Sequence, residues 1–145
     1  MLAAVLIAAR VLTGLLAGGF FLATLGLRPA AESLSPPDHI RLRQALIPRF
    51  RRLFLPLMLL AAAATALWLF SRPAPPPTRL WLALSCAVLV PATTLLVNVP
   101  VNNRVLWWSP ESPPTGWGAD LARWNAADAL RLALSLTAFL CVVIS

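Results

Sequence analysis

Four long apolar runs, separated by short polar stretches, dominate the chain. They cover approximately residues 2–27, 53–70, 80–101 and 124–145. A helix that crosses a bilayer needs about 20 mainly apolar residues, so each run predicts one membrane helix. Short connections make sequential helices antiparallel neighbours. The pattern therefore predicts an all-α fold, an integral membrane antiparallel four-helix bundle, with residues 1–145 forming a single four-span domain.

A basic, amphipathic stretch at residues 39–52 precedes the second run. Before it, Ser35 is a good N-cap, Pro36 suits a first helical turn, and Asp38 suits the positive end of a helix dipole. A helix is therefore predicted to begin here. It either lies along the inner membrane surface or extends the second membrane helix into the cytoplasm.

The charges indicate a membrane partner and an orientation. Of the 145 residues, 59% are apolar and 12% are charged, and all twelve basic residues are Arg, with a net charge of +7; a soluble domain carries about 25% charged residues. One predicted side of the membrane holds Arg28, Arg41, Arg43, Arg49, Arg51, Arg52, Arg104 and Arg123. The other holds Arg72 and Arg79. This asymmetry places both termini outside the cytoplasm, in a bacterial-type inner (plasma) membrane. Because the Arg residues lie against apolar segments, the expected partner is the lipid bilayer and not nucleic acid.

An Asn-Val-Pro-Val-Asn motif at residues 98–102 ends the third apolar run. Asn98 and Asn102 are four residues apart and share one helix face, and Thr94 extends this polar stripe by one turn. Pro100 has no N–H, so it leaves one backbone carbonyl without its usual partner. In lipid, each unsatisfied polar group costs on the order of several kcal/mol. The cluster therefore marks either a helix-packing contact or a site.

The start of the fourth run carries a second polar cluster. Trp124, Asp128 and Arg131 fall at i, i+4 and i+7, on one helix face, and the two charged residues can pair. In an antiparallel bundle, Asn98 and Asn102 approach the same half of the membrane, so the four polar residues are expected to meet there. Three interpretations stay open: a packing contact between helices three and four, a small-molecule site, or an ion or proton path.

Small residues and cysteines carry weaker signals. Gly14 and Gly18 form a Gly-x-x-x-Gly pattern, which predicts close packing of the first helix. Cys86 and Cys141 lie inside apolar runs, where they are expected to be small buried hydrophobes. The bundle permits a disulfide between them, but the sequence does not predict one.

Four features carry a resemblance to a known family. They are the Gly-rich first helix that ends in Arg28-Pro29, the motif at 98–102, the Pro-Pro-x-x-Trp loop at 113–117, and the helix start at 123–131. Together they resemble the anthrone oxygenase-like family of small four-helix membrane proteins, whose bacterial members are mostly a domain of unknown function. The family often has His where this chain has Asp128. The resemblance implies an oxygenase that acts on anthrone-like or other small aromatic or polyketide substrates.

The resemblance gives the polar residues tentative roles. Asp128 is the expected base, although pairing with Arg131 weakens it in that role. The expected donors to the enolate oxygen are Arg131, Asn98 and Asn102. The expected substrate contacts are Thr94 and Trp124. The sequence has no His pair for haem, no metal-ligand cluster and no Gly-rich dinucleotide loop, so neither a cofactor nor a metal is expected.

Two non-enzymatic functions remain as alternatives. One is an accessory or scaffold bundle, in which the polar residues only hold helices together. The other is a small transporter, which is less favoured because residues 2–27 contain no acidic side chain.

Overall fold

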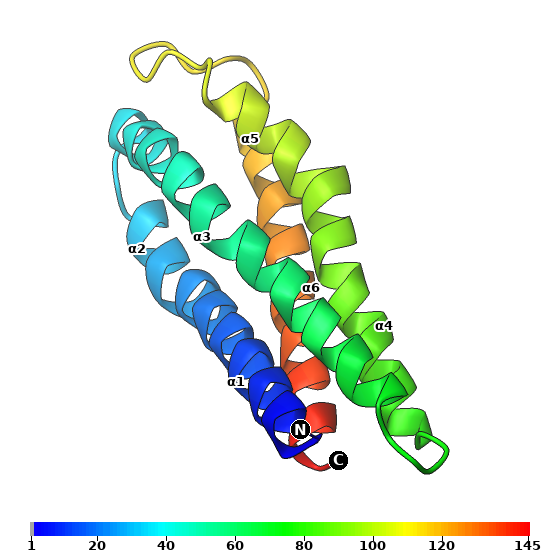
Figure 1. Ribbon diagram of the computed structural model, residues 1–145. Coiled ribbons are helices and arrows are strands. Elements are labelled where there is room, and N and C mark those ends of the chain that lie inside the picture. Colours follow the sequence, from blue (N-terminus) through cyan, green and yellow to red (C-terminus); the bar gives the residue numbers. More distant parts are fainter. Residues whose placement is uncertain (1) are drawn as a thin grey trace.

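The computed structural model describes residues 2–145, which form four long helical rods (Figure 1). The first rod joins α1 (Leu2–Phe21), η1 (Leu22–Leu27) and α2 (Arg28–Glu32). The second rod is α3 (Pro36–Phe70). The third joins α4 (Thr78–Thr93), η2 (Thr94–Asn98) and α5 (Val99–Val105), and the fourth is α6 (Trp117–Val143). Each rod is long and apolar enough to cross a membrane, and the predicted all-α four-helix fold is confirmed.

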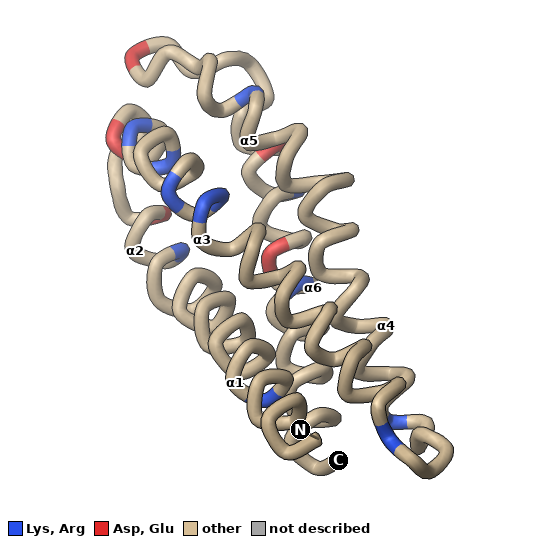
Figure 2. The backbone as a smooth tube through the Cα atoms, viewed as in Figure 1, with Lys and Arg blue, Asp and Glu red and all other residues tan. Residues whose placement is uncertain are grey.

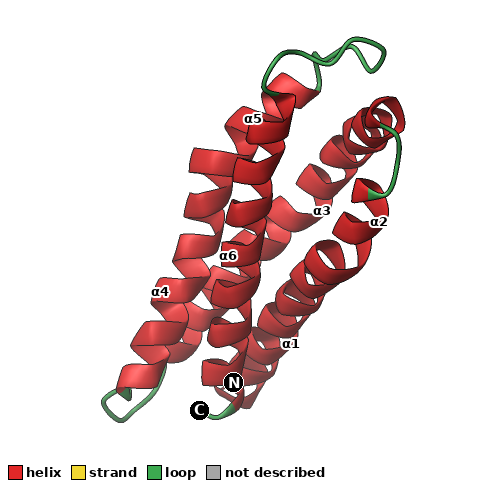
Figure 3. Ribbon diagram, turned by 180° about the vertical axis from the view of Figure 1, so that it is seen from behind, coloured by secondary structure: helices red, strands yellow, loops and turns green. Residues whose placement is uncertain are grey.

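The rods form an antiparallel bundle. α1 packs against α3 and α6, and α4 packs against the same two helices, so α6 closes the ring back onto α1. Both termini lie at the end of the bundle that carries the 71–77 connection, as the two opposite views show (Figures 1 and 3). Basic residues gather at the other end, mainly along the first half of α3 (Figure 2).

The basic stretch extends the second membrane helix, which settles one of the two sequence alternatives. α3 is continuous from Pro36 to Phe70, and the side chain of Ser35 caps it by accepting a hydrogen bond from the Asp38 amide at 3.4 Å. Pro48 and Pro56 lie inside this helix. The predicted helix start is therefore present, and the helix begins well before the apolar run at 53–70.

The other helices are also longer than their apolar runs. The first rod continues to Glu32, and the connection between the third and fourth rods is only 106–116. α5 and α6 extend toward each other because Arg104 forms a two-point ion pair with Asp120, at 3.0 and 2.5 Å. Gly116 then makes the turn into α6 with a φ of 86°, a conformation that favours glycine.

The first rod packs closely through Gly14 and Gly19, and not through the predicted Gly14–Gly18 pair. A Cβ at Gly14 would lie 3.0 Å from the Phe139 ring, and a Cβ at Gly19 would lie 2.8 Å from the Phe54 ring. A Cβ at Gly18 would have no neighbour within 4 Å. The spacing of five places these contacts on different neighbours, α6 and α3, which the Gly-x-x-x-Gly pattern does not distinguish.

Apolar side chains from all four rods fill the core of the bundle. One cluster lies toward the termini and includes Ala9, Leu69, Leu80 and Val142. Cys86 and Cys141 are both free thiols.

Two rods contain a π-helical turn shortly before a proline. η1 precedes Pro29 by two residues, and η2 precedes Pro100 by two residues. In each case the backbone N–H that follows the π-turn bonds to the carbonyl five residues earlier. Proline cannot donate the regular helical hydrogen bond, so both prolines favour such a local change. Because π-turns are rare and often occur at functional sites, η1 and η2 point to the region where a site should be sought.

Candidate functional site

A buried ion pair lies in α6 at the level of the two π-turns. Arg131 Nη2 donates to Asp128 Oδ1 at 2.5 Å, and the two side chains are only 8% and 1% exposed. The pair expected from their three-residue spacing is therefore present. In Figure 2 these charges stand apart from the basic residues at the end of the bundle.

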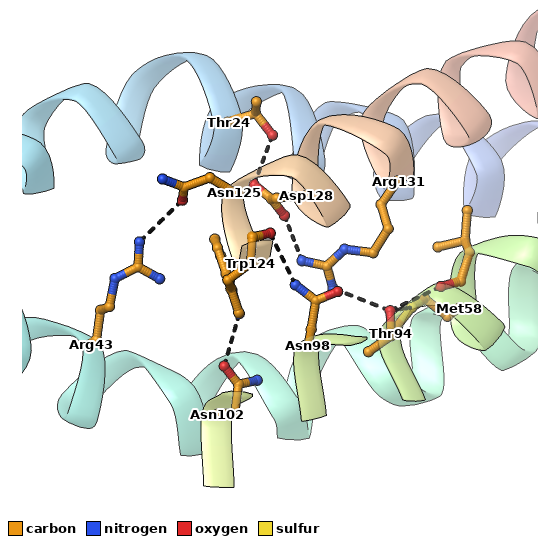
Figure 4. A network of polar contacts seen from close by, with 11 residues as sticks. Thr24, Arg43, Met58, Thr94, Asn98, Asn102, Trp124, Asn125, Asp128 and Arg131 are labelled. Atoms are coloured by element: carbon orange, nitrogen blue, oxygen red, sulfur yellow. Dashed lines mark hydrogen bonds and ion pairs between the residues drawn. The ribbon is translucent and has the colours of Figure 1, made fainter. Parts of the chain in front are cut away.

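Threonines of the two π-turns form hydrogen bonds with this pair (Figure 4). Thr24 Oγ1 in η1 donates to Asp128 Oδ2 at 2.9 Å. Thr94 Oγ1 in η2 accepts from Arg131 Nη1 at 3.1 Å and donates to the Val90 carbonyl at 2.9 Å. The ion pair therefore connects three of the four rods.

The two asparagines contact Trp124 and make no hydrogen bond to the ion pair in the described chain. Asn98 Nδ2 donates to the Trp124 carbonyl at 3.4 Å, and Asn102 Oδ1 accepts from Trp124 Nε1 at 2.9 Å. The expectation that four polar residues meet directly is therefore corrected. The reason is the helical rise of 1.5 Å per residue. Since Thr94 lies level with Arg131, Asn102 lies about 12 Å further along its rod, beside the first turns of α6.

A cavity of about 250 Å³ lies between α3 and the other rods and borders this polar cluster. Its walls are mainly apolar, and the aromatic residues among them are Phe20, Phe50, Phe54 and Trp124. Five of the six residues predicted from the sequence line it: Thr94, Asn102, Trp124, Asp128 and Arg131. Asn98 is fully buried but does not line the cavity.

Arg131 presents a guanidinium group to this cavity between aromatic rings. Its Cζ lies 4.7 Å from the ring centroid of Phe20 and 5.6 Å from that of Trp124. Its Nε is buried and has no hydrogen-bond partner among residues 2–145. A cation at an apolar cavity wall is suited to stabilise negative charge on a bound molecule.

Sequence reasoning missed Thr24 as part of the site. It is a lone hydroxyl in an apolar run, and nothing in the helical spacing links it to Asp128. The one available signal is its position five residues before Pro29.

Arg43 was also missed, because it appeared to be one of several surface Arg residues. Its Nε donates to His39 Nε2 at 2.8 Å, and its Nη2 donates to Asn125 Oδ1 at 3.3 Å. Its Cζ lies 4.5 Å from the Trp124 ring centroid. Arg43 and Arg131 therefore both contact Trp124, and both line the cavity.

The 106–116 loop is fastened to α3 at the charged end of the bundle. Gln44 Nε2 donates to the carbonyls of Val105 and Trp108, at 2.9 and 2.8 Å. Arg41 forms an ion pair with Glu111. A hydrogen bond from its own backbone N–H, and then the Arg41 guanidinium, hold the pKa of Glu111 below its usual value. The loop is thereby held beside the half of α3 that lines the cavity.

Metal-ligating side chains do not cluster in the described chain. Within residues 2–145, no group of three or more His, Cys, Asp and Glu residues is placed to hold a metal ion. Asp128 is the one carboxylate among the residues that line the cavity.

Four apolar helices that enclose a buried polar site fit a multi-pass membrane protein. The model of the family described as anthrone oxygenase matches residues 49–141, which is more than half of the chain. The chain therefore belongs to the anthrone oxygenase family. No curated protein and no solved structure matches it. The matched residues include the ion pair and η2, whereas Thr24 and Arg43 lie outside them.

Proposed function

We propose that this protein is a membrane oxygenase that oxidises an anthrone-like aromatic molecule in the cavity beside α6. The observation that carries the proposal is the location of the buried Asp128–Arg131 pair on the wall of an aromatic-lined cavity. Family membership supports the same reaction class. At about 250 Å³, the cavity is slightly below the ~300–1,000 Å³ typical of ligand sites, which suits a compact ligand.

The proposed reaction converts the CH₂ group of an anthrone, together with O₂, into a carbonyl group and water. A base removes one C–H proton, and the resulting enolate carries its negative charge mainly on oxygen. The enolate carbon forms a bond to O₂, which with a proton gives a hydroperoxide on that carbon. Loss of the remaining C–H proton breaks the O–O bond, releases hydroxide and leaves the carbonyl, and the hydroxide takes up a proton to become water.

Arg131 is proposed to stabilise the enolate oxygen. Its Nη1 and Nη2 donate to Thr94 and Asp128, and each of these nitrogens keeps a second N–H that can donate to a substrate oxygen. An apolar surrounding strengthens such an interaction, because little water screens it. Thr94 and Asp128 fix the guanidinium in place before the charge develops, which is the arrangement that favours a transition state.

Asp128 is proposed as the proton acceptor. It is the one carboxylate on the cavity wall, and each of its oxygens accepts one side-chain hydrogen bond, from Thr24 or Arg131. A carboxylate oxygen has two lone-pair sites, so a site remains for a proton. Oδ2 is the better candidate atom, because its partner is a neutral hydroxyl.

Trp124 and the two asparagines are proposed as binding and positioning residues. Asn102 fixes the indole ring through Nε1, and Asn98 contacts the backbone of the same residue. The indole is thereby a fixed part of the aromatic wall against which an aromatic substrate can pack. Neither asparagine is proposed to touch the reacting atoms.

The test is oxygen consumption by the purified protein in dodecyl maltoside with anthrone as substrate, together with the absorbance of the anthraquinone formed. We expect Asp128→Asn to lower kcat by at least about 100-fold, the lower range for loss of a general base. Asp120→Asn is the matched control, since it changes an α6 carboxylate outside the cavity lining. A wild-type rate no greater than that of denatured protein would refute oxygenase activity on anthrone.

An accessory or scaffold bundle is the second candidate function. The observation that favours it is that the ion pair and its threonines connect three rods, as expected for polar contacts that hold membrane helices together. If the protein is a scaffold, substitutions at Asp128 or Arg131 should alter folding, and the wild-type protein should show no turnover.

We also propose that the end of the bundle with the 106–116 loop faces the cytoplasm. The eight Arg residues predicted on that side support this orientation through the positive-inside rule. Both termini then lie outside the cytoplasm.

A further inference from the structure

The cavity carries more positive than negative charge. Four of its lining residues are Arg28, Arg43, Arg51 and Arg131, and its one acidic lining residue is Asp128. Arg28 pairs with Glu32 at 2.9 Å, and Arg131 pairs with Asp128. Within residues 2–145, neither Arg43 nor Arg51 has an ion-pair partner. Arg43 and Arg51 therefore line a mainly apolar cavity without an ion-pair partner in the described chain.

Arg43 is the better placed of these two cations. Its partners are neutral: the His39 ring nitrogen, the Asn125 side-chain oxygen and the face of Trp124. The carboxylates of Asp128 and Glu32 act on it through space, and Asn125 Nδ2 donates to Glu32 Oε1 at 3.0 Å. The neutral contacts hold the guanidinium in one position and leave it without a direct ion pair in the described chain.

Arg43 also keeps donors free. A guanidinium has five N–H donors, and Nη1 of Arg43 makes no hydrogen bond to any residue in the range 2–145. The Nη1 and Nη2 edge can therefore donate two parallel hydrogen bonds to a carboxylate, the geometry that Arg prefers.

Arg43 and the paired cation Arg131 lie on opposite sides of an aromatic ring. Figure 4 shows Trp124 between Arg43 and Arg131. The cavity thus offers an anion site at its charged end, an aromatic surface in the middle and the ion pair at its inner end. A flat molecule that packs along the aromatic wall of the cavity can place an anionic substituent at Arg43 while its reacting ring carbon faces Arg131 and Asp128.

We propose that this cavity selects an aromatic anion, a fused-ring molecule whose carboxylate is held by Arg43. This inference rests on the proposed function, because it assigns the substrate class of the same site. The aromatic walls and the small volume favour a fused-ring acid over a phospholipid, although an anionic headgroup offers similar charge.

The experiment measures binding of two matched probes to the full chain in dodecyl maltoside by isothermal titration calorimetry. 9-Anthracenecarboxylate carries the anion, and 9-anthracenecarboxamide has the same rings without the charge. We expect the acid to bind at least about tenfold more tightly, the effect of one charge-assisted hydrogen-bonded contact. Equal affinities, or no measurable binding of either probe, would overturn the proposal without any variant.

Variants then assign the effect to a residue. Arg43→Gln should lower the affinity for the acid by about tenfold and leave that for the amide within about twofold. Arg52→Gln is the matched control, because Arg52 is a nearby exposed cation of α3 outside this cavity. Unchanged acid affinity in folded Arg43→Gln would overturn the assignment. If that variant does not fold, the acid-to-amide ratio of the unchanged protein remains decisive.

A competition experiment with lipid distinguishes the two sources of negative charge, an aromatic acid and a lipid headgroup. Adding phosphatidylglycerol to the micelles should leave the affinity for the acid within about twofold, whereas displacement of the acid would assign the site to lipid headgroups and overturn the proposal.

Failure of the anion proposal is also distinguishable from failure of the proposed oxygenase activity. Equal binding of acid and amide alongside oxygen uptake would refute only the anion preference, and selective acid binding without oxygen uptake would refute only the reaction.

Discussion

Replacing Asp128 by Leu removes the carboxylate that compensates Arg131. The guanidinium would stay buried with Thr94 as its remaining side-chain acceptor. Removing one partner of a buried ion pair destabilises a protein by about 3–5 kcal/mol. The ring contacts with Phe20 and Trp124 remain, and each contributes about 0.5–2 kcal/mol. We therefore expect a loss of about 3 kcal/mol in the free energy of unfolding, which is roughly 100-fold in the unfolding equilibrium.

The double variant Asp128→Leu/Arg131→Met separates a structural role of the pair from a chemical one. Replacing both charges by apolar side chains of similar size is often neutral or stabilising. We expect its free energy of unfolding to lie within about 1 kcal/mol of the wild-type value, so adding Arg131→Met should recover about 2–3 kcal/mol of the loss caused by Asp128→Leu. The exposed pair between Arg104 and Asp120 is the control, since Asp120→Leu should change stability by at most about 1 kcal/mol.

The assay is reversible unfolding of the purified protein in dodecyl maltoside by added sodium dodecyl sulfate, followed by circular dichroism. A double variant as unstable as Asp128→Leu alone, with a recovery below about 0.5 kcal/mol, would refute the reasoning. In that case the pair would be needed for stability, as the scaffold function requires. A stable double variant that lacks oxygenase activity would instead tie the pair to chemistry.

Two further predictions concern packing and orientation. Gly19→Ala should lower the free energy of unfolding by about 1–3 kcal/mol, because its Cβ would lie 2.8 Å from the Phe54 ring, whereas Gly18→Ala should be neutral or stabilising by up to about 1 kcal/mol. Thermal unfolding of both variants checks this, and equal stabilities would contradict it. For orientation, an impermeant maleimide should label Ala74→Cys in intact cells and label Thr115→Cys only after lysis. The reverse pattern would contradict the proposed orientation.

Most of the fold could be predicted from hydrophobic pattern alone. Four apolar runs of adequate length leave few other arrangements, and short connections settle which helices are neighbours. Helix ends were less predictable, because apolar content marks only the part of a helix that contacts lipid or the core of the bundle. α3 and α6 both begin in polar sequence, where Ser35 and Gly116 make the start.

The polar site was only partly predictable. Asp128 and Arg131 were recognisable because they lie three residues apart on one helix, and local spacing determines whether they meet. Thr24 and Arg43 reach the site from other rods, and their contacts depend on how the rods are turned about their axes. The π-turns change that rotation, because each inserts an extra residue into a helical turn. A proline in the sequence shows where such a turn is favoured, but it does not show whether a kink or a π-turn results.

The arrangement of this site argues for function over simple packing. Arg131 Nε and Asn98 Oδ1 are buried without partners in the described chain, and each such group costs about 1–3 kcal/mol. Beside Arg131, the cavity leaves space that larger apolar side chains would fill with a gain in stability. Two destabilising features thus occur together, at the level where both rods depart from regular α-helix. Polar contacts that served only to hold helices would be better satisfied and better packed, so unpaired buried groups close to an open cavity are the arrangement expected of a functional site.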